Sequence, residues 1–253
     1  MTFEGRATLV AHGPDGRSTS SGSIAGDRIA VVTCDLGSPF GATEPGRGDA
    51  IRVFELPSGK YLAELRGHAG TICQIAFAAD GKTVASAGED NTLRFWDLAE
   101  GTQKRQIDVA GHLVSDPTSD RQGAPARVTA AAFSANGKIA ATSGLWDDRL
   151  IIWDLSSGKP VRTIRVKDNS GAELAICPDG RILASVSKTH RAGADDTPDD
   201  DAIHLWDVAT GREVLRLEPK DARARSLSFS ADGNSLVTGM DDTTTLIWDV
   251  RPR

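Results

Sequence analysis

The sequence has no apolar run of about 18 residues or more, so it predicts no membrane-spanning helix and no membrane partner. Its first ten residues, MTFEGRATLV, contain neither the basic nor the apolar stretch of a secretory signal, and none is expected. Only three cysteines occur, Cys34, Cys73 and Cys177, and none is spaced like a zinc or redox motif. We therefore expect buried thiols and a cytoplasmic location.

Positive charge is also scarce. The formal net charge is −6, with 29 Lys and Arg against 35 Asp and Glu, whereas a protein that binds nucleic-acid backbones needs a basic stripe. We therefore expect no nucleic-acid partner. The sequence also lacks a glycine-rich phosphate loop and a G-x-S-x-G motif, so it predicts no cofactor and no catalytic residue.

What the sequence does contain is a repeated segment that ends in Trp-Asp or a similar pair. Its fullest copy is GEDNTLRFWDL at Gly88–Leu98, and the others are DAIRVFEL at Asp49–Leu56, DDRLIIWDL at Asp147–Leu155, DAIHLWDV at Asp201–Val208 and DTTTLIWDV at Asp242–Val250. The aromatic positions 54 and 96 lie 42 residues apart, as do 206 and 248, while the gaps between 96, 153 and 206 are 57 and 53. A period of about 40–45 residues is typical of a four-stranded propeller blade.

The residues around each pair support four short strands per repeat. Apolar residues alternate ahead of the aromatic residue, which is the period of a β-strand. A turn ending in glycine follows each of the first four pairs: LPSG, LAEG, LSSG and VATG. Hairpin turns such as AADGK, SANGK, CPDGR and SADGN precede the last four pairs, and their glycines suit positive φ. The pattern predicts an all-β chain without helices.

On these residues the chain resembles the WD40 repeat family over nearly its whole length, and its Ala-, Arg-, Asp- and Gly-rich composition resembles bacterial members. The resemblance implies an all-β fold, a five-bladed WD40-type β-propeller. We expect one domain over residues 1–253, with blades at about residues 13–66, 67–111, 112–167, 168–218, and 219–253 together with 2–11.

We further expect the ring to be closed by an N-terminal strand that completes the last blade. Gly5–Leu9 (GRATL) reads like Gly211–Leu215 (GREVL), the expected outer strand of the preceding blade. Such a strand would cover exposed sheet edges. The alternative is an open ring that closes against another chain, so the prediction is a monomer, with oligomerisation as the alternative.

The resemblance also implies a hydrogen-bonded His–Ser–Asp–Trp tetrad within a blade. A buried indole N–H needs an acceptor and a buried carboxylate needs a partner, so a complete network would stiffen its blade. Ser86, His68 and Asp90 are also the residue types of a catalytic triad, but their repetition beside tryptophan favours a structural role. The predicted tetrad residues are His68, Ser86, Asp90 and Trp96 in the second blade, His112, Ser143, Asp147 and Trp153 in the third, and Thr238, Asp242 and Trp248 in the fifth.

Three segments exceed the repeat, Asp35–Gly48, Leu113–Ala126 and Lys188–Asp200, and in the WD40 architecture they would share one face. The residue before each tetrad aspartate would lie on that face too. Long loops on a rigid scaffold commonly carry recognition, so we predict that this face binds a protein or peptide. Trp146 is either an anchor for that partner or packs under the second segment. The candidate partner-binding residues are Glu89, Trp146 and Asp241.

Two other chemistries have weaker support. The acidic run from Asp195 to Asp201 could offer oxygen ligands to Ca²⁺, but its order does not fit a known calcium loop, so we predict a solvated loop and no metal. A propeller enzyme, hydrolase-like, with its site at the central channel mouth would need converging carboxylates or histidines, and Glu89 and Asp241 are too few. The sequence therefore predicts a non-catalytic interaction scaffold rather than an enzyme.

Overall fold

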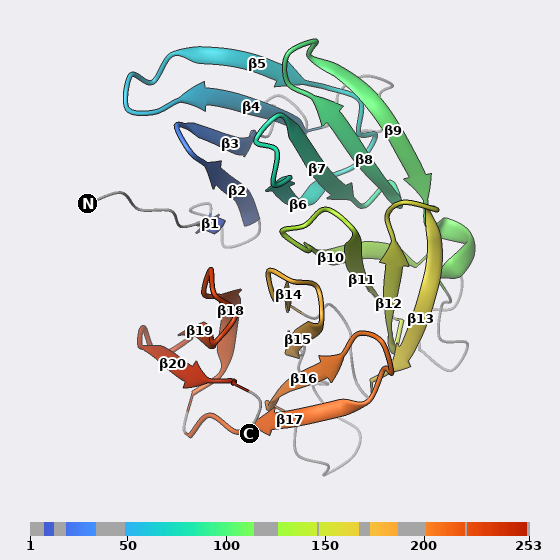
Figure 1. Cartoon of the computed structure of the whole chain (residues 1–253), viewed down its shortest axis with the longest axis vertical. Helices are drawn as coiled ribbons and strands as arrows, with labels where there is room; N and C mark the ends of the chain where they lie inside the picture. The colour runs from blue at the N-terminus through green and yellow to red at the C-terminus, as the bar shows by residue number, and fades with distance from the viewer. Residues whose placement is uncertain are drawn as a thin grey trace. The chain divides into compact units, whose positions relative to one another are not determined.

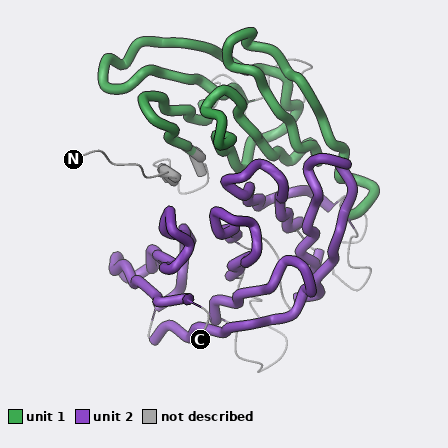
Figure 2. Tube along the Cα trace, in the orientation of Figure 1, with its two compact units in different colours: residues 1–112 green, residues 113–253 purple. Residues whose placement is uncertain are grey.

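The computed structural model describes residues 8–12, 19–33, 49–113, 126–145, 147–166, 173–186, 201–220 and 222–251. These residues form twenty β-strands and one short 3₁₀ turn, η1 (Ala110–His112), without an α-helix (Figure 1). The chain divides into two compact units, Met1–His112 and Leu113–Arg253 (Figure 2), which we describe separately.

The first unit contains two antiparallel sheets. In each sheet the strands are neighbours in the order in which they occur along the chain. The first sheet consists of β1 (Thr8–His12), β2 (Thr19–Ala25), β3 (Arg28–Thr33), β4 (Ala50–Glu55) and β5 (Tyr61–Leu65). The second consists of β6 (Ile72–Phe77), β7 (Thr83–Gly88), β8 (Thr92–Asp97) and β9 (Thr102–Asp108).

The second unit contains three antiparallel sheets of the same design. The third sheet of the chain consists of β10 (Arg127–Phe133), β11 (Ile139–Leu145), β12 (Arg149–Asp154) and β13 (Lys159–Arg165). The fourth consists of β14 (Glu173–Ile176), β15 (Ile182–Val186), β16 (Ile203–Asp207) and β17 (Glu213–Leu217). The fifth consists of β18 (Ala224–Phe229), β19 (Ser235–Met240) and β20 (Thr245–Asp249).

The aspartate of the Trp-Asp pair caps the turn that follows it. Asp207 Oδ1 accepts hydrogen bonds from the backbone N–H and the hydroxyl of Thr210, both at 2.7 Å, and Gly211 completes the turn at φ 72°. Asp97 and Asp154 accept in the same way from the backbone N–H groups of Ala99 and Ser156. Because the carboxylate satisfies backbone donors that no strand pairs, the dipeptide ends one strand and starts the turn to the next.

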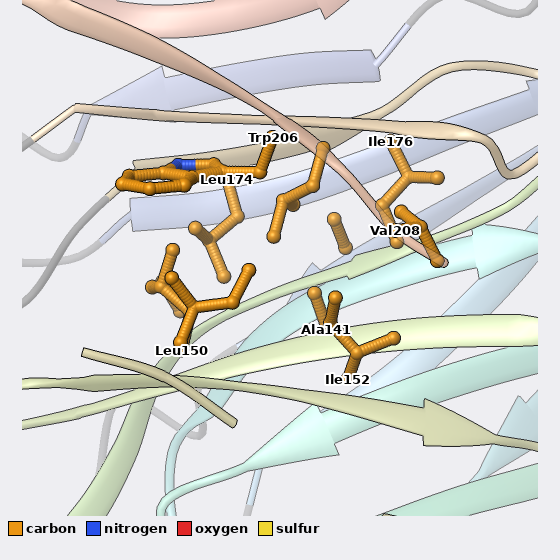
Figure 3. Close-up of a cluster of buried hydrophobic side chains, with 11 residues drawn as sticks. Ala141, Leu150, Ile152, Leu174, Ile176, Trp206 and Val208 are labelled. Atoms are coloured by element: carbon orange, nitrogen blue, oxygen red, sulfur yellow. The ribbon is translucent and has the colours of Figure 1, made fainter. Parts of the chain in front are cut away.

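Apolar side chains pack between successive sheets within each unit. In the first unit, Ile51 of β4 packs with Phe77, Val84 and Trp96 of the second sheet. In the second unit, a cluster between the third and fourth sheets is shown in Figure 3, and another joins the fourth and fifth sheets. The cluster of Figure 3 includes Ala141, Leu150, Ile152, Leu174, Ile176, Trp206 and Val208. Within each unit, a sheet therefore buries an apolar face against the next sheet, as propeller blades do.

The predicted fold class is confirmed: the chain is all β and consists of five blades of the WD40 β-propeller type. The predicted role of the N-terminal strand is wrong. β1 pairs with β2, with Thr8 opposite Ser23 and His12 opposite Thr19, and among the described residues the last sheet has three strands. Only six residues separate β1 from β2, so this hairpin closes a far shorter loop than pairing with β20 would.

Candidate functional site

The second sheet holds a complete network of buried polar side chains. His68 and Ser86 are 3% and 0% exposed, and Trp96 is 2% exposed. Trp96 Nε1 donates to Ser86 Oγ at 2.8 Å, and Ser86 Oγ lies 2.8 Å from His68 Nε2. His68 Nδ1 lies 3.0 Å from both oxygens of Asp90. Every group is satisfied when the Ser86 hydroxyl donates to Nε2 and Nδ1–H donates to Asp90.

Asp90 is the most densely bonded member of this network. Besides His68, it accepts from Ala69 N at 2.9 Å, from Thr92 Oγ1 at 2.8 Å and from an Arg94 guanidinium nitrogen at 3.1 Å. Burial by itself would raise the pKa of Asp90, but the hydrogen bonds that the carboxylate accepts from His68 and the other donors hold that pKa well below its usual range. The carboxylate therefore stays ionised and fixes the start of β8 against the residues after β5.

Gly88 leaves room for this network. A Cβ on Gly88 would lie 2.7 Å from His68 Nδ1 and 3.1 Å from Asp90 Oδ1, closer than atoms normally approach. The last residue of β7 must therefore lack a side chain for the imidazole and the carboxylate to meet. The glycine of the segment S-A-G-E-D, Ser86–Asp90, is therefore required by the space around it as well as by the turn that follows.

In the third sheet the predicted acceptor for the indole is wrong. Trp153 Nε1 donates to Thr142 Oγ1 at 2.9 Å, not to Ser143. Successive side chains of a strand point to opposite faces, so a one-residue error in register selects the wrong side chain. Asp147 is buried and forms an ion pair with Arg149, whose nitrogens lie 2.7 and 3.0 Å from its oxygens. His112 lies in η1 and is exposed, unlike the buried His68.

The fourth and fifth sheets keep the indole bond, and in the fifth sheet the aspartate has a different role. In the fifth sheet, Trp248 Nε1 donates to Thr238 Oγ1 at 3.0 Å, while Asp242 is exposed and caps its own turn by accepting from Thr244. These bonds to Thr244 lower the pKa of Asp242. In the fourth sheet, Trp206 Nε1 donates to Ser185 Oγ at 2.9 Å, an acceptor that the sequence did not single out.

Glu89 and Asp241 occupy the same position in their repeats, directly after the second strand of the blade. Glu89 N donates to Thr71 O at 2.8 Å, and Asp241 N donates to Arg223 O at 2.9 Å. Glu89 is half-buried and Asp241 is exposed. Trp146, the third predicted member of this set, lies outside the described residues, as do residues 34–48, 114–125 and 187–200, which hold most of the three inserted segments.

The basic residues near Asp241 are paired with carboxylates. Asp241 Oδ1 accepts from Arg223 N at 2.9 Å, and its Oδ2 lies 3.4 Å from an Arg225 nitrogen, contacts that lower the pKa of Asp241. Arg223 Nε lies 3.1 Å from Asp201. This part of the surface is therefore charge-balanced, with two carboxylates facing two guanidinium groups.

Two of the three thiols lie in the described part of the chain, and both are hydrogen-bonded. Cys73 Sγ donates to Ala87 O at 3.3 Å, and Cys177 Sγ donates to Asp179 Oδ1 at 2.7 Å. Burial and the neighbouring Asp179 raise the pKa of Cys177, so it remains a protonated thiol at neutral pH. The described residues contain no group of three or more His, Cys, Asp or Glu placed to hold a metal ion, and no helix there is long and apolar enough to cross a membrane.

Three segments of the chain that contain these strands and Trp-centred bonds match the WD40 repeat. The family model for "WD domain, G-beta repeat" matches residues 59–97, 116–154 and 211–249. Each matched segment ends on the aspartate of a Trp-Asp pair, Asp97, Asp154 or Asp249. The family match and the geometry therefore identify the same repeating unit.

Curated proteins of a plant and of fungi are among those similar to the chain. Autophagy-related protein 16 of Arabidopsis thaliana is 26% identical over 206 residues, which cover 81% of this chain and 35% of that protein. Mitochondrial division protein 1 of Eremothecium gossypii is 30% identical, covering 79% and 28%, and Nuclear distribution protein PAC1-2 of Uncinocarpus reesii is 26% identical, covering 72% and 38%. These relatives are eukaryotic and do not support the predicted resemblance to bacterial members. The chain spans between 28 and 38% of their lengths.

Proposed function

We propose that the chain is a non-catalytic interaction module that binds a protein or peptide through the loop-rich face predicted from its sequence. Its similar proteins carry names from autophagy, mitochondrial division and nuclear distribution. Proteins named for such different processes share similar sequences over this region. A binding module can serve different processes because it can present different surface side chains on the same core.

The observation that carries this proposal is the repeated, rigid placement of Glu89 and Asp241. Each follows a strand whose interior is paired on both sides, and each is fixed by a backbone hydrogen bond to the residue before the first strand of its blade. A side chain presented from a fixed backbone loses little freedom on binding, so more of its contact energy appears as affinity. In the sequence, Trp146 likewise precedes the aspartate of the third repeat, and we propose it as the aromatic anchor.

The alternative, a propeller enzyme, has less support. Ser86 is 0% exposed, and its hydroxyl lies between Trp96 Nε1 and His68 Nε2, each 2.8 Å away. A nucleophile must reach the substrate, and its lone pair must be available for attack. Ser86, His68 and Asp90 are the residue types of a catalytic triad, but their burial and bonding are those of a structural hydrogen-bond network.

Site-specific photo-crosslinking tests the proposed face. A photoreactive phenylalanine analogue is placed at position 89, 146 or 241, and each protein is irradiated in a lysate of the source organism. The matched controls are position 82, directly before β7, and position 234, directly before β19, both exposed. We expect a shared protein adduct from the first three positions, reduced at least tenfold at the two controls. Equal adducts at positions 82 and 234 would show that the face is misassigned.

We further propose that the module acts as a cytoplasmic monomer without a nucleic-acid partner. The hydrogen-bonded thiols of Cys73 and Cys177 are compatible with a reducing compartment. Sedimentation velocity over a hundredfold range of protein concentration measures the oligomeric state, and a sedimentation coefficient that rises with concentration would contradict the monomer.

A further inference from the structure

Asn136 is the only asparagine of the chain that is followed by glycine. The chain has four asparagines, which in order precede Thr, Gly, Ser and Ser: Asn91, Asn136, Asn169 and Asn234. Asn136 lies in the turn that joins β10 to β11 (Figure 1). The corresponding turns of the second, fourth and fifth sheets carry an aspartate before their glycine, namely Asp80, Asp179 and Asp232. The third sheet therefore has an amide where these three sheets have a carboxylate.

Two donors bond the side-chain carbonyl oxygen of Asn136. Lys138 N donates to Asn136 Oδ1 at 3.0 Å, and Ser134 Oγ lies 2.7 Å from the same atom. Ser134 Oγ also lies 3.0 Å from Ile139 O, but Ile139 O already accepts from Ser134 N at 2.9 Å. The single hydroxyl hydrogen of Ser134 therefore belongs to the shorter contact, and Oδ1 accepts from both groups.

These two donors favour attack on the side-chain carbonyl carbon of Asn136. When a nucleophile adds to a carbonyl group, negative charge develops on the oxygen, and donors already directed at that oxygen stabilise the charge. The backbone nitrogen of Gly137 is the available nucleophile, because its attack on Cγ closes a ring within one dipeptide. Glycine has no Cβ to crowd this ring. Gly137 N donates to Ser134 O at 3.0 Å and must give up this bond to react.

We propose that Asn136 is a site of spontaneous deamidation in the folded chain. The Gly137 nitrogen gives up its proton and bonds to Cγ of Asn136, the Cγ–Nδ2 bond breaks, and Nδ2 leaves with that proton as ammonia. Water then opens the cyclic imide at Cγ, which gives an aspartate, or at the backbone carbonyl, which gives an isoaspartate. The reaction consumes one water and releases one ammonia. It requires neither a partner nor an enzyme, so it is independent of the proposed interaction function.

The fifth sheet shows that this turn accepts an aspartate. Asp232 Oδ1 accepts from Asn234 N at 3.0 Å and from Ser230 Oγ at 2.6 Å, the same two bonds that Asn136 Oδ1 makes in the third sheet. The bond from Ser230 and those from Asn234 lower the pKa of Asp232 to about 2. An aspartate at position 136 would therefore keep both donors and carry a negative charge at neutral pH.

The amide nitrogen of Asn136 makes the bond that the reaction removes. Nδ2 donates to Asp179 O at 3.0 Å, which links this turn to the turn between β14 and β15. The amide orientation follows from its partners, because Lys138 N needs an acceptor and Asp179 O needs a donor. An oxygen in place of Nδ2 would face another acceptor. Deamidation therefore breaks a hydrogen bond between the third and fourth sheets and adds a negative charge.

Incubation of the unmodified whole chain in water enriched in heavy oxygen tests the reaction. After digestion in ordinary water, mass spectrometry measures the heavy oxygen in each peptide. We expect the peptide with Asn136 to gain one heavy oxygen at least tenfold faster than those with Asn91 and Asn234, and faster still at mildly alkaline pH. Asn91 and Asn234 are internal controls, because the residues that follow them carry side chains. Equal rates at the three sites, or no gain at Asn136, would overturn the proposal.

Ser134→Ala tests whether the folded turn assists the reaction. The substitution removes one donor to Asn136 Oδ1 and should slow the gain of heavy oxygen at least threefold in the folded chain, with no change in urea. Ser230→Ala removes the equivalent hydroxyl from the fifth sheet and is the matched control, which should leave the rate at Asn136 unchanged. An equal or faster reaction in folded Ser134→Ala would overturn the assisted mechanism. The labelling of the unmodified chain does not depend on whether this variant folds.

Asn136→Asp tests the consequence of the reaction, because it reproduces the aspartate product. It keeps the acceptor for Lys138 N and loses the bond to Asp179 O, whereas Asn136→Ala loses every side-chain bond. The urea midpoint of Asn136→Asp should therefore lie between those of the unmodified chain and Asn136→Ala. A midpoint equal to that of the unmodified chain would overturn the loss of the link between the turns. A midpoint below that of Asn136→Ala would overturn the fit of an aspartate in this turn.

Discussion

Replacing Ser86 by alanine tests whether its hydroxyl is a structural link between two buried groups. The substitution removes the acceptor of the Trp96 indole N–H and the partner of His68 Nε2, and neither group can reach water because Trp96 and His68 are 2% and 3% exposed. A buried polar group left without a partner costs about 1–3 kcal/mol, so Ser86→Ala should lower the free energy of unfolding by about 2–6 kcal/mol.

Ser185→Ala provides the internal comparison. Ser185 Oγ is likewise buried and accepts the Trp206 indole N–H at 2.9 Å, but that sheet has no histidine in the position of His68. One buried donor is then left without its acceptor, so the expected loss is about 1–3 kcal/mol. Ser58→Ala, an exposed hydroxyl that bonds Glu55, is the control and should leave the unfolding midpoint unchanged.

Urea unfolding followed by circular dichroism at several wavelengths measures these differences. The comparison requires equal m-values among the variants, because an altered slope signals a changed unfolding reaction. If Ser86→Ala loses no more stability than Ser185→Ala, the Ser86 hydroxyl does not serve two groups, and the linked arrangement of the second blade is refuted.

Three further substitutions, two of them with a matched comparison, have expected outcomes. Asp90→Asn should make the free energy of unfolding depend less on pH in the acid range. The pKa of Asp90 is lowered in the folded state, so the carboxylate stabilises the fold above the unfolded pKa of about 3.9, and this stabilisation is lost as the pH falls below that value. Gly88→Ala should cost about 1–3 kcal/mol because its Cβ meets the network, whereas Gly111→Ala, with open space around it, should be tolerated. Ile152→Ala should cost about 2–5 kcal/mol by opening a cavity, and Ile247→Ala should cost far less.

Each of these has a clear contrary result. For Asp90→Asn, urea unfolding midpoints are measured from pH 2 to pH 7, a range that spans the ordinary Asp pKa of about 3.9. If the midpoint falls with decreasing pH as steeply as in the unmodified protein, groups other than Asp90 control acid unfolding. Equal melting temperatures for the two glycine variants would contradict the steric argument. Equal losses at Ile152 and Ile247 would mean that exposure at position 247 does not reflect the native environment.

Periodicity made the fold predictable. The segments read as strands before Phe54, Trp96, Trp153, Trp206 and Trp248 are β4, β8, β12, β16 and β20. The turn glycines also follow the prediction, because positive φ is a local demand that sequence records directly. Strands and turns could therefore be predicted because alternating apolar residues and turn glycines depend only on residues close together in the sequence.

The site was less predictable because one residue shifts the face of a strand. Ser86 and Ser143 both lie four residues before an aspartate, which made them look equivalent. Register gives a better rule: the hydroxyl that bonds the indole lies two residues beyond the cross-strand partner of tryptophan, which is Val84 for Trp96 and Ala140 for Trp153. That rule selects Thr142, and it requires pairing information that spacing along the chain does not contain.

The N-terminal strand was misplaced for a different reason. GRATL resembles a covering strand in composition, but composition does not decide between two available edges. β2 is next along the chain and offers a short hairpin, whereas β20 is at the far end of the sequence. Competition between a near and a distant partner is decided by chain entropy as well as side-chain fit.

Four of the five tryptophans share one environment, an indole N–H bonded to a serine or threonine hydroxyl on the neighbouring strand. The first sheet places Phe54 at this position, with its ring 5.8 Å from that of Tyr61, so phenylalanine is already accommodated in one blade. Versions of the chain that keep a single indole and replace the others by phenylalanine would each emit from one known sheet. Their emission would report the order in which the sheets come apart and whether the two compact units melt together.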